Sequence, residues 1–122
     1  MDLLDTTVLV DLLRKNTAAL TWLRSTTGKP AVSVVSLTEL FAGARTRREE
    51  QEILVLERSV RLLSLDRDIA VRAGVFVRLY GASHNIDDPD AIIAATTEHH
   101  GLKLATLNIK HFPMFPKLKR PY

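Results

Sequence analysis

Three acidic side chains stand where an expected strand gives way to a helix. Asp5 follows Leu3–Leu4, Glu39 comes shortly after Val34–Val35, and Asp90 lies at the start of an expected helix. In an open parallel sheet such places meet in the crevice outside the carboxyl ends of the strands. Three carboxylates gathered there would repel one another unless protons or a divalent cation offset their charge. The first hypothesis is therefore a metal-dependent active site.

Neutral oxygen donors and the histidines narrow the choice of metal. Thr106 ends the last expected strand and Asn108 follows it, and an asparagine in that place is more often a turn residue. The chain has no cysteine, and none of its four histidines has a partner at the spacing of a zinc site. We read the histidines as surface or loop residues, with His111 a candidate for a phosphate contact. Hard oxygen ligands indicate Mg²⁺, with Mn²⁺ as a substitute.

Helix capping offers a structural interpretation of the first two acids. An aspartate after a strand often caps a helix, but Thr6 and Thr7 are better placed to cap the helix that follows Asp5. Ser36 and Glu39 have the spacing of a capping box, in which the glutamate bonds to the backbone N–H of the serine. Asp5 is thus expected to be free for function, whereas Glu39 has two competing roles.

The third acid lies in a run of acidic residues. Asp87, Asp88 and Asp90 surround Pro89, and a proline at the first helical position makes Asp88 the expected cap. An acid in the first turn is also favoured by the helix dipole. Position alone leaves Asp90 equally explained as a ligand or as a dipole-stabilised surface residue.

The elements that would position these side chains alternate between strand and helix. Strands are predicted at residues 2–4, 31–35, 60–65 and 102–106, with a short fifth strand near 117–119. Helices are predicted at residues 8–14, 17–24, 36–44, 47–59, 66–80 and 88–100, with Gly81 ending the fifth and a short turn at 108–112. This alternation predicts one α/β domain over residues 1–122, with a central parallel sheet of four to five strands and helices on both faces.

Composition and charge indicate the class of protein, the charge of its substrate and its location. The 122 residues are 46% hydrophobic and 25% charged, which is typical of a globular domain. The net charge is +3, and a basic surface around an acidic site suits a polyanionic substrate held next to a cation. No apolar run approaches the ~18 residues of a membrane span, and the N-terminus lacks the basic and apolar pattern of a signal peptide. We expect a cytoplasmic protein with no membrane partner.

Four segments in register resemble the PIN-domain ribonucleases, and most of all the VapC-type toxins of bacterial and archaeal toxin–antitoxin modules. The segments are Leu3–Leu13, Val35–Gly43, Asp90–Thr96 and Ala105–Phe112. They span essentially the whole chain in the order found in that family. Each motif alone is weak, and their combination carries the resemblance.

The resemblance implies a ligand set and a reaction. Asp5, Glu39 and Asp90 match the metal-binding carboxylates of the family, and Asn108 stands where many members have a fourth acid, with Thr106 beside it. The implied reaction is hydrolysis of an RNA phosphodiester by a metal-activated water. Because Asn108 is neutral, we expect one metal ion to bind firmly and a second to arrive with RNA.

The resemblance also implies protein partners. These are a cognate VapB-type antitoxin that blocks the site, a second copy in a homodimer, and a toxin–antitoxin hetero-oligomer. The apolar stretch from Val8 to Leu23 is a candidate groove for an antitoxin helix, with Leu12, Leu20 and Trp22 as contacts. Trp22 is equally explained by simple packing.

Basic residues on two sides of the expected site are candidates for guiding RNA. The first group is Arg45, Arg47 and Arg48, and the second is Lys110, Lys117, Lys119 and Arg120. Any one of them is also explained as ordinary solvated surface. As a group they predict an RNA affinity that falls with salt concentration.

Two readings from other functional classes remain. A phosphoacceptor signalling domain also gathers acids around Mg²⁺, but it needs an acceptor aspartate after the third strand, where Asp66 begins a helix instead. A binding module that has lost catalysis would act through antitoxin or nucleic-acid contact. The intact acids argue against this second reading, and Asn108 keeps it open.

Overall fold

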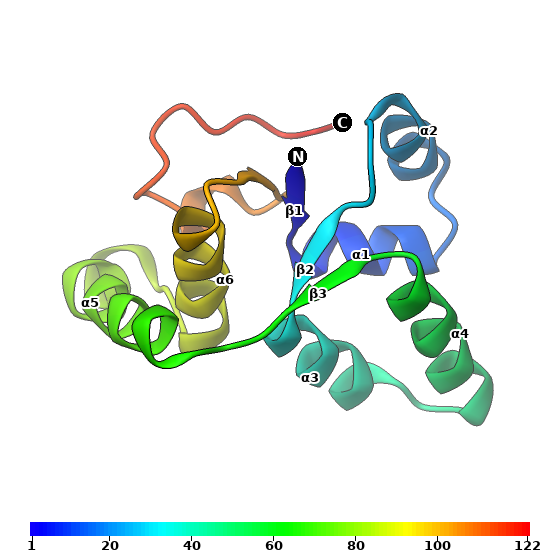
Figure 1. Ribbon diagram of the computed structural model, residues 1–122, viewed down its shortest axis with the longest axis horizontal. Coiled ribbons are helices and arrows are strands. Elements are labelled where there is room, and N and C mark those ends of the chain that lie inside the picture. The colour runs from blue at the N-terminus through cyan, green and yellow to red at the C-terminus, as the bar shows by residue number, and fades with distance from the viewer.

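A four-stranded sheet lies between two groups of helices in a computed structural model that describes all residues from 1 to 122 (Figure 1). The strands are β1 (Asp2–Leu4), β2 (Ala31–Ser33), β3 (Arg61–Leu63) and β4 (Lys103–Ala105). All neighbouring strands pair in parallel, in the order β3-β2-β1-β4. The prediction of a parallel α/β domain is confirmed.

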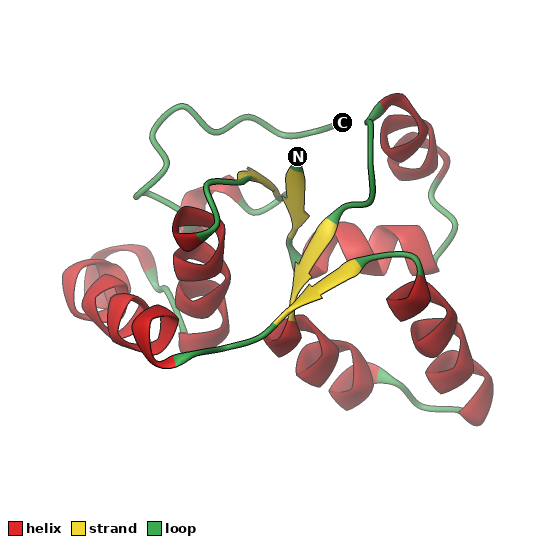
Figure 2. Ribbon diagram, viewed as in Figure 1, coloured by secondary structure: helices red, strands yellow, loops and turns green.

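Six helices and one 3₁₀ turn complete the chain and lie on both sides of the sheet (Figure 2). They are α1 (Thr6–Leu13), α2 (Thr17–Ser25), α3 (Val34–Gly43), α4 (Arg47–Arg58), α5 (Arg67–His84), α6 (Asp88–His99) and the turn η1 (Ile109–His111). None of these helices combines the length and the apolar character needed to cross a membrane.

Successive strand residues point to opposite faces of the sheet and build two separate cores. Leu3 and Leu104 pack against α5 and α6 on one face. Leu4 and Ala105 pack on the other face against residues from α1, α2, α3 and α4. The near-continuous apolar strands are explained by this burial on both sides.

The strand order creates a crevice where the site was expected. From β1 the chain adds β2 and β3 on one side, and it then returns to place β4 on the other side of β1. The order therefore reverses between β1 and β4, and ligands of open α/β sheets bind outside the carboxyl ends of the strands at such a point. Asp5 directly follows β1 and Thr106 directly follows β4.

The fifth strand expected near residues 117–119 is absent. No backbone hydrogen bond joins residues 113–122 to β4, and the tail makes only two local turns, in which Phe115 bonds to Phe112 and Leu118 to Phe115. Pro113, Pro116 and Pro121 lack the N–H group that a strand ladder requires, which explains the error.

Several element ends also differ from the prediction. Strand β2 stops at Ser33, and α3 begins two residues before the expected Ser36. Helix α5 passes through Gly81 and continues to His84, where Asn85 takes the left-handed conformation with φ 54° that ends it. Asparagine is one of the few residues that tolerate this conformation.

Asp66 caps α5 as the sequence predicts, whereas the caps of four other helices lie one or more residues earlier than predicted. Asp5, rather than Thr6 or Thr7, caps α1, and Asn16 caps α2. Helix α3 is capped by Ser33, and α6 by Asp87 instead of Asp88. Each cap has a short side-chain oxygen that accepts a hydrogen bond from a backbone N–H at the start of its helix.

Candidate active site

Asp5 is fixed at the end of β1 by a complete set of local contacts. Only 3% of the residue is exposed. One carboxylate oxygen accepts from the Thr6 backbone N–H at 2.8 Å, while the other accepts from the Thr7 and Thr106 hydroxyls at 2.9 and 2.6 Å. The expectation that Asp5 would be free of capping was wrong. Because a carboxylate offers about four lone-pair directions, these three bonds leave about one for a ligand.

Thr106 orients Asp5 rather than offering a free ligand. Its fully buried hydroxyl donates to Asp5 and accepts from the Asn108 backbone N–H at 2.9 Å. The Thr7 hydroxyl similarly accepts from the Leu107 backbone N–H at 3.2 Å. The loop after β4 is thereby tied to the loop after β1.

Glu39 is not part of a capping box, because Ser36 lies inside α3 instead of preceding it. The Glu39 Oε1 atom lies 2.6 Å from the Thr6 hydroxyl, which is also 2.9 Å from the Ser36 hydroxyl. With one proton, Thr6 can donate to only one of them at a time, and the carboxylate is the stronger acceptor. The second oxygen of Glu39 is left for other partners.

Asp90 lies at the start of α6 and contacts a histidine. Its Oδ2 atom is 3.0 Å from His111 Nδ1, and Asn108 Nδ2 is 3.1 Å from the same ring nitrogen. Sequence analysis had left His111 without a partner, since 21 residues separate it from Asp90. Its place in the turn that carries Asn108 was the available signal. The structure therefore adds His111 to the candidate site.

The acids influence one another electrostatically. Burial raises the pKa of Glu39, the Thr6 hydrogen bond opposes the rise, and the charges of Asp5 and Asp87 add to it. The pKa of Asp90 is raised to about 6 by burial and then by the charge of Asp87, against the lowering effect of the His111 hydrogen bond. Asp87 therefore acts on these acids electrostatically in addition to capping α6. The four interacting carboxylates are Asp5, Glu39, Asp87 and Asp90.

These donors fit a hard divalent cation that keeps part of its water shell. Asp5, Glu39 and Asp90 present oxygen atoms only, and each has an oxygen or lone pair not used by the protein. No three acidic or histidine side chains converge into a ready-made metal cage. Mg²⁺ usually binds through one or two carboxylates and retains several waters, so a cage is not required.

The basic residues expected to guide RNA lie in different places. Lys117, Lys119 and Arg120 line a groove beside β4 that contains none of Asp5, Glu39 and Asp90. Lys110 is exposed in η1, next to His111, and the exposed Arg45, Arg47 and Arg48 lie before and at the start of α4. Arg48 pairs with Glu52 at 3.4 Å.

Trp22 packs against the C-terminal tail, and it also lines the groove beside β4. Its ring stacks on Tyr122 with centroids 6.1 Å apart, and the Tyr122 hydroxyl donates to Asp11 at 2.8 Å. Leu12 is buried in the core and Leu20 packs against it. Leu12, Leu20 and Trp22 therefore contribute to packing, whereas Val10 and Leu13 of the same stretch face an open cleft.

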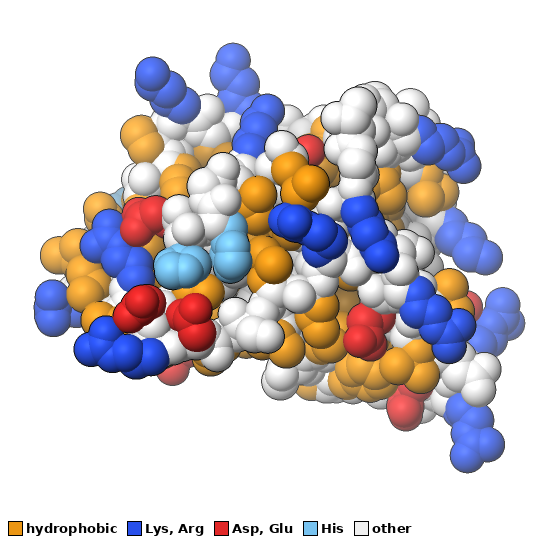
Figure 3. Space-filling model, in the orientation of Figure 1, with side chains coloured by type: hydrophobic (Ala, Val, Ile, Leu, Met, Phe, Trp, Pro, Cys, Tyr) orange, Lys and Arg blue, Asp and Glu red, His pale blue; other side chains and the backbone are white.

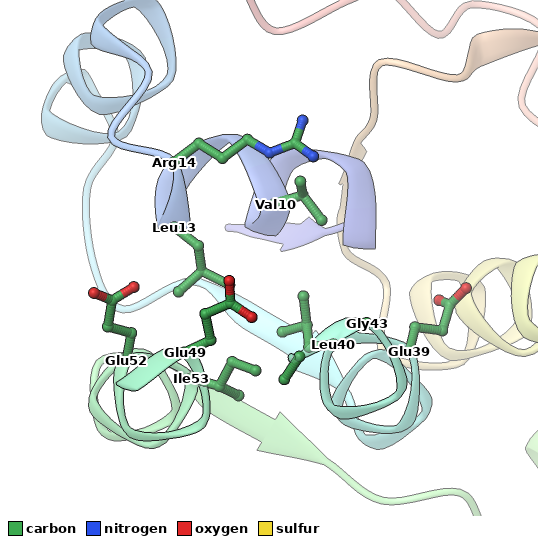
Figure 4. Close-up of a pocket in the computed structure, with 10 residues that line it drawn as sticks. Val10, Leu13, Arg14, Glu39, Leu40, Gly43, Glu49, Glu52 and Ile53 are labelled. Carbon is green, nitrogen blue, oxygen red and sulfur yellow. The ribbon is translucent and has the colours of Figure 1, made fainter. Parts of the chain in front are cut away.

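This open cleft of about 300 Å³ lies between α1, α3 and α4 (Figure 4). Its apolar wall includes Val10, Leu13, Leu40 and Ile53. Its charged residues are Glu39, Glu49, Glu52 and Arg14. Figure 4 shows Glu49 and Glu52 on α4, while Glu39 points away from them on the other side of α3.

Residues 3–117 match the family model of the PIN domain. The chain belongs to the PIN-domain family. The resemblance drawn from four short motifs is confirmed, and a phosphoacceptor signalling domain is no longer an alternative.

This PIN domain is similar to ribonucleases of Mycobacterium tuberculosis over its whole length. Ribonuclease VapC10 is 46% identical over 125 residues, an alignment that covers 100% of this chain and 93% of the relative. Ribonuclease VapC19 is 41% identical over 129 residues and is covered completely, as is this chain.

Solved structures of similar chains come from toxin–antitoxin assemblies. A toxin–antitoxin complex from Klebsiella pneumoniae contains a chain with 30% identity and a TM-score of 0.85, and the match covers 100% of this PIN domain and 98% of that chain. FitAcB from Neisseria gonorrhoeae gives 28% identity and a TM-score of 0.71, over 92% and 91% of the two chains.

Replacing Thr106 with valine tests the contacts of Asp5. The substitution keeps the shape of the side chain and removes both hydrogen bonds of the hydroxyl. We expect the free energy of unfolding to fall by about 1–3 kcal/mol, because a buried carboxylate loses a partner. Urea unfolding measures the change, and Thr106→Ser, which keeps the hydroxyl, should remain near the wild type. Equal losses for the two variants would contradict this account.

The raised pKa of Asp90 predicts how stability of the metal-free PIN domain depends on pH. The folded protein retains a proton on Asp90 up to a pKa of about 6, whereas the unfolded chain releases it near the ordinary aspartate pKa of 3.8. Stability from this residue is therefore present at low pH and is lost as pH rises through about 6. The variant Asp90→Asn has no carboxyl group to titrate at this position, so it does not lose stability in this way as pH rises.

The measurement compares thermal unfolding from pH 4 to 7 in a chelator. The stability of Asp90→Asn should improve relative to the wild type as pH rises. Asp88→Asn, which changes an exposed acid of the same helix, should follow the wild-type curve. Parallel curves for Asp90→Asn and the wild type would show that Asp90 titrates normally.

Proposed function

We propose that this PIN domain is a metal-dependent endoribonuclease and the toxin of a type II toxin–antitoxin pair. The observation that carries the proposal is that Asp5, at the crevice between β1 and β4, lies near enough to both Glu39 and Asp90 for its charge to add to the rise that burial causes in their pKa values. Relatives that are named ribonucleases and match the whole chain at 46% and 41% identity support it.

The residues of the chain prepare this crevice for phosphodiester hydrolysis. Asp5 is held by three hydrogen bonds, and Thr6 holds one oxygen of Glu39. His111 donates to Asp90 and so favours the ionised carboxylate needed for metal binding. A bound Mg²⁺, or Mn²⁺ in its place, would lower the pKa of water and offset charge developing on the phosphate oxygens.

The antitoxin is proposed to occupy the cleft between α1, α3 and α4. Apolar residues form one wall of this cleft, and three glutamates outnumber the single Arg14. An apolar segment carrying a basic side chain would match both properties. Because Glu39 lines the cleft and also shares the field of Asp5, an occupant that engages Glu39 would block the site directly. The expected assembly is a VapB-type antitoxin bound to a homodimer of this chain.

Removing one carboxylate distinguishes an active enzyme from a binding module without catalysis. Cleavage of a labelled RNA by the wild type should depend on Mg²⁺, and Asp90→Asn should lower the rate at least about 100-fold, because metal-assisted charge stabilisation supplies several kcal/mol. Asp88→Asn is the matched control and should cleave normally. An inactive wild type would support the alternative of a PIN-like module that acts through antitoxin or nucleic-acid contact. Equal cleavage by Asp90→Asn would point to a contaminating nuclease or to a wrong site.

A metal titration tests the number of ions held without RNA. The three carboxylates carry fewer negative charges than two divalent cations require, and Asn108 adds none. We expect isothermal calorimetry to show one firm Mg²⁺ site, with a second site formed only when RNA supplies its phosphate. Asp87→Asn keeps a capping side chain and removes its charge, so it should leave the single site in place. Two firm sites in the absence of RNA would contradict the prediction.

A further inference from the structure

A groove of about 780 Å³ lies between β4 and the C-terminal tail, apart from the proposed catalytic crevice. Four basic residues line it, namely Lys103, Lys117, Lys119 and Arg120, against the single acid Asp2. None of the five takes part in a side-chain ion pair. Figure 3 shows Lys and Arg side chains standing along the top of the view, where the tail runs in Figure 1. The groove therefore presents uncompensated positive charge.

The floor of the groove is apolar and partly aromatic. Its residues include Trp22, Leu102, Leu104, Phe115 and Leu118. A basic rim over an aromatic and aliphatic floor is the combination that binds single-stranded nucleic acid without sequence preference, because phosphates meet the cations and bases stack below. An acidic peptide would use the rim but would gain less from the aromatic floor.

The groove is held open by contacts at both ends of the tail. Phe112 is buried in the core at one end. At the other end, Tyr122 stacks on Trp22 and donates to Asp11. No backbone hydrogen bond closes the tail onto β4. A site with fixed walls loses little conformational entropy when it is filled.

The position of the groove relates it to the catalytic crevice. Asp2 and Lys103 begin β1 and β4, while Asp5 and Thr106 follow the other ends of these strands. Asp2 and Asp5 are three residues apart, which corresponds to about 10 Å of extended chain. The groove and the crevice therefore lie at opposite ends of the same two strands.

We propose that this groove binds a single-stranded segment of the RNA substrate outside the site of cleavage. The inference rests on the proposed ribonuclease function, since it assigns the groove to the same substrate. Lys117 and Lys119 contact the backbone, and the apolar floor accepts bases. The groove thus contributes affinity that is independent of the metal and of the three carboxylates.

Binding without divalent ions tests the groove separately from catalysis. The probe is a fluorescein-labelled 20-nucleotide poly(U) RNA, followed by anisotropy in chelator over a range of salt concentrations. Lys117→Gln with Lys119→Gln should weaken binding about tenfold and reduce the slope of log affinity against log salt by about 1.4, since each lost phosphate contact on a single strand accounts for about 0.7. The control, Arg58→Gln with Arg78→Gln, makes the same charge change on exposed parts of α4 and α5. Thermal unfolding confirms that each variant is folded.

Cleavage of the same RNA in Mg²⁺ separates the two proposals. If the wild type does not cleave but the Lys117 and Lys119 variant alone loses affinity, the ribonuclease proposal fails and the groove remains an RNA site. If the wild type cleaves and the variant binds and cleaves like its control, the groove proposal is overturned. That result would leave an acidic protein segment as the occupant to examine.

Discussion

The burial of the Asp5 carboxylate is the constraint on which the rest of the site depends. A carboxyl group on a residue that is only 3% exposed is tolerated only if hydrogen bonds replace the water it has lost. Those bonds come from the start of α1 and from Thr106 after β4, so the same contacts join two strands and one helix. The fold at the end of β1 and the chemistry of the site are therefore the same set of interactions.

Glu39 connects the candidate metal site with the surface of the molecule. It lines the cleft between α1, α3 and α4, and its pKa is raised by burial and further by the charges of Asp5 and Asp87. A partner that pairs with Glu39 would relieve this repulsion, as a cation would. Inhibitor and metal would then compete for one carboxylate, and inhibition would need no change of conformation elsewhere.

The arrangement of strands and helices was predictable because apolar periodicity and turn signals act locally. Asp5 and Asp90 could be singled out for the same reason, since each stands at a junction visible in the sequence. Asp5 was misjudged as free of capping because Thr6 and Thr7 offered equally good local caps, and only the buried pairing with Thr106 settles the choice. The Asp90 contact of His111 was missed because this partner comes from another helix. The tail was misread because the spacing of its three prolines, which interrupt any strand ladder, was not given enough weight.

The two cores fix the register of β1, and with it the number of residues in the strand. Leu3 enters one core and Leu4 the other, so a slip of β1 by a single residue would exchange their faces and carry Asp5 about 3.3 Å out of place. Changes of side-chain size within these strands alter packing locally, whereas an insertion or deletion disturbs both cores and the site together. Evolutionary drift in this region is consequently expected to proceed by substitution and to leave strand length untouched.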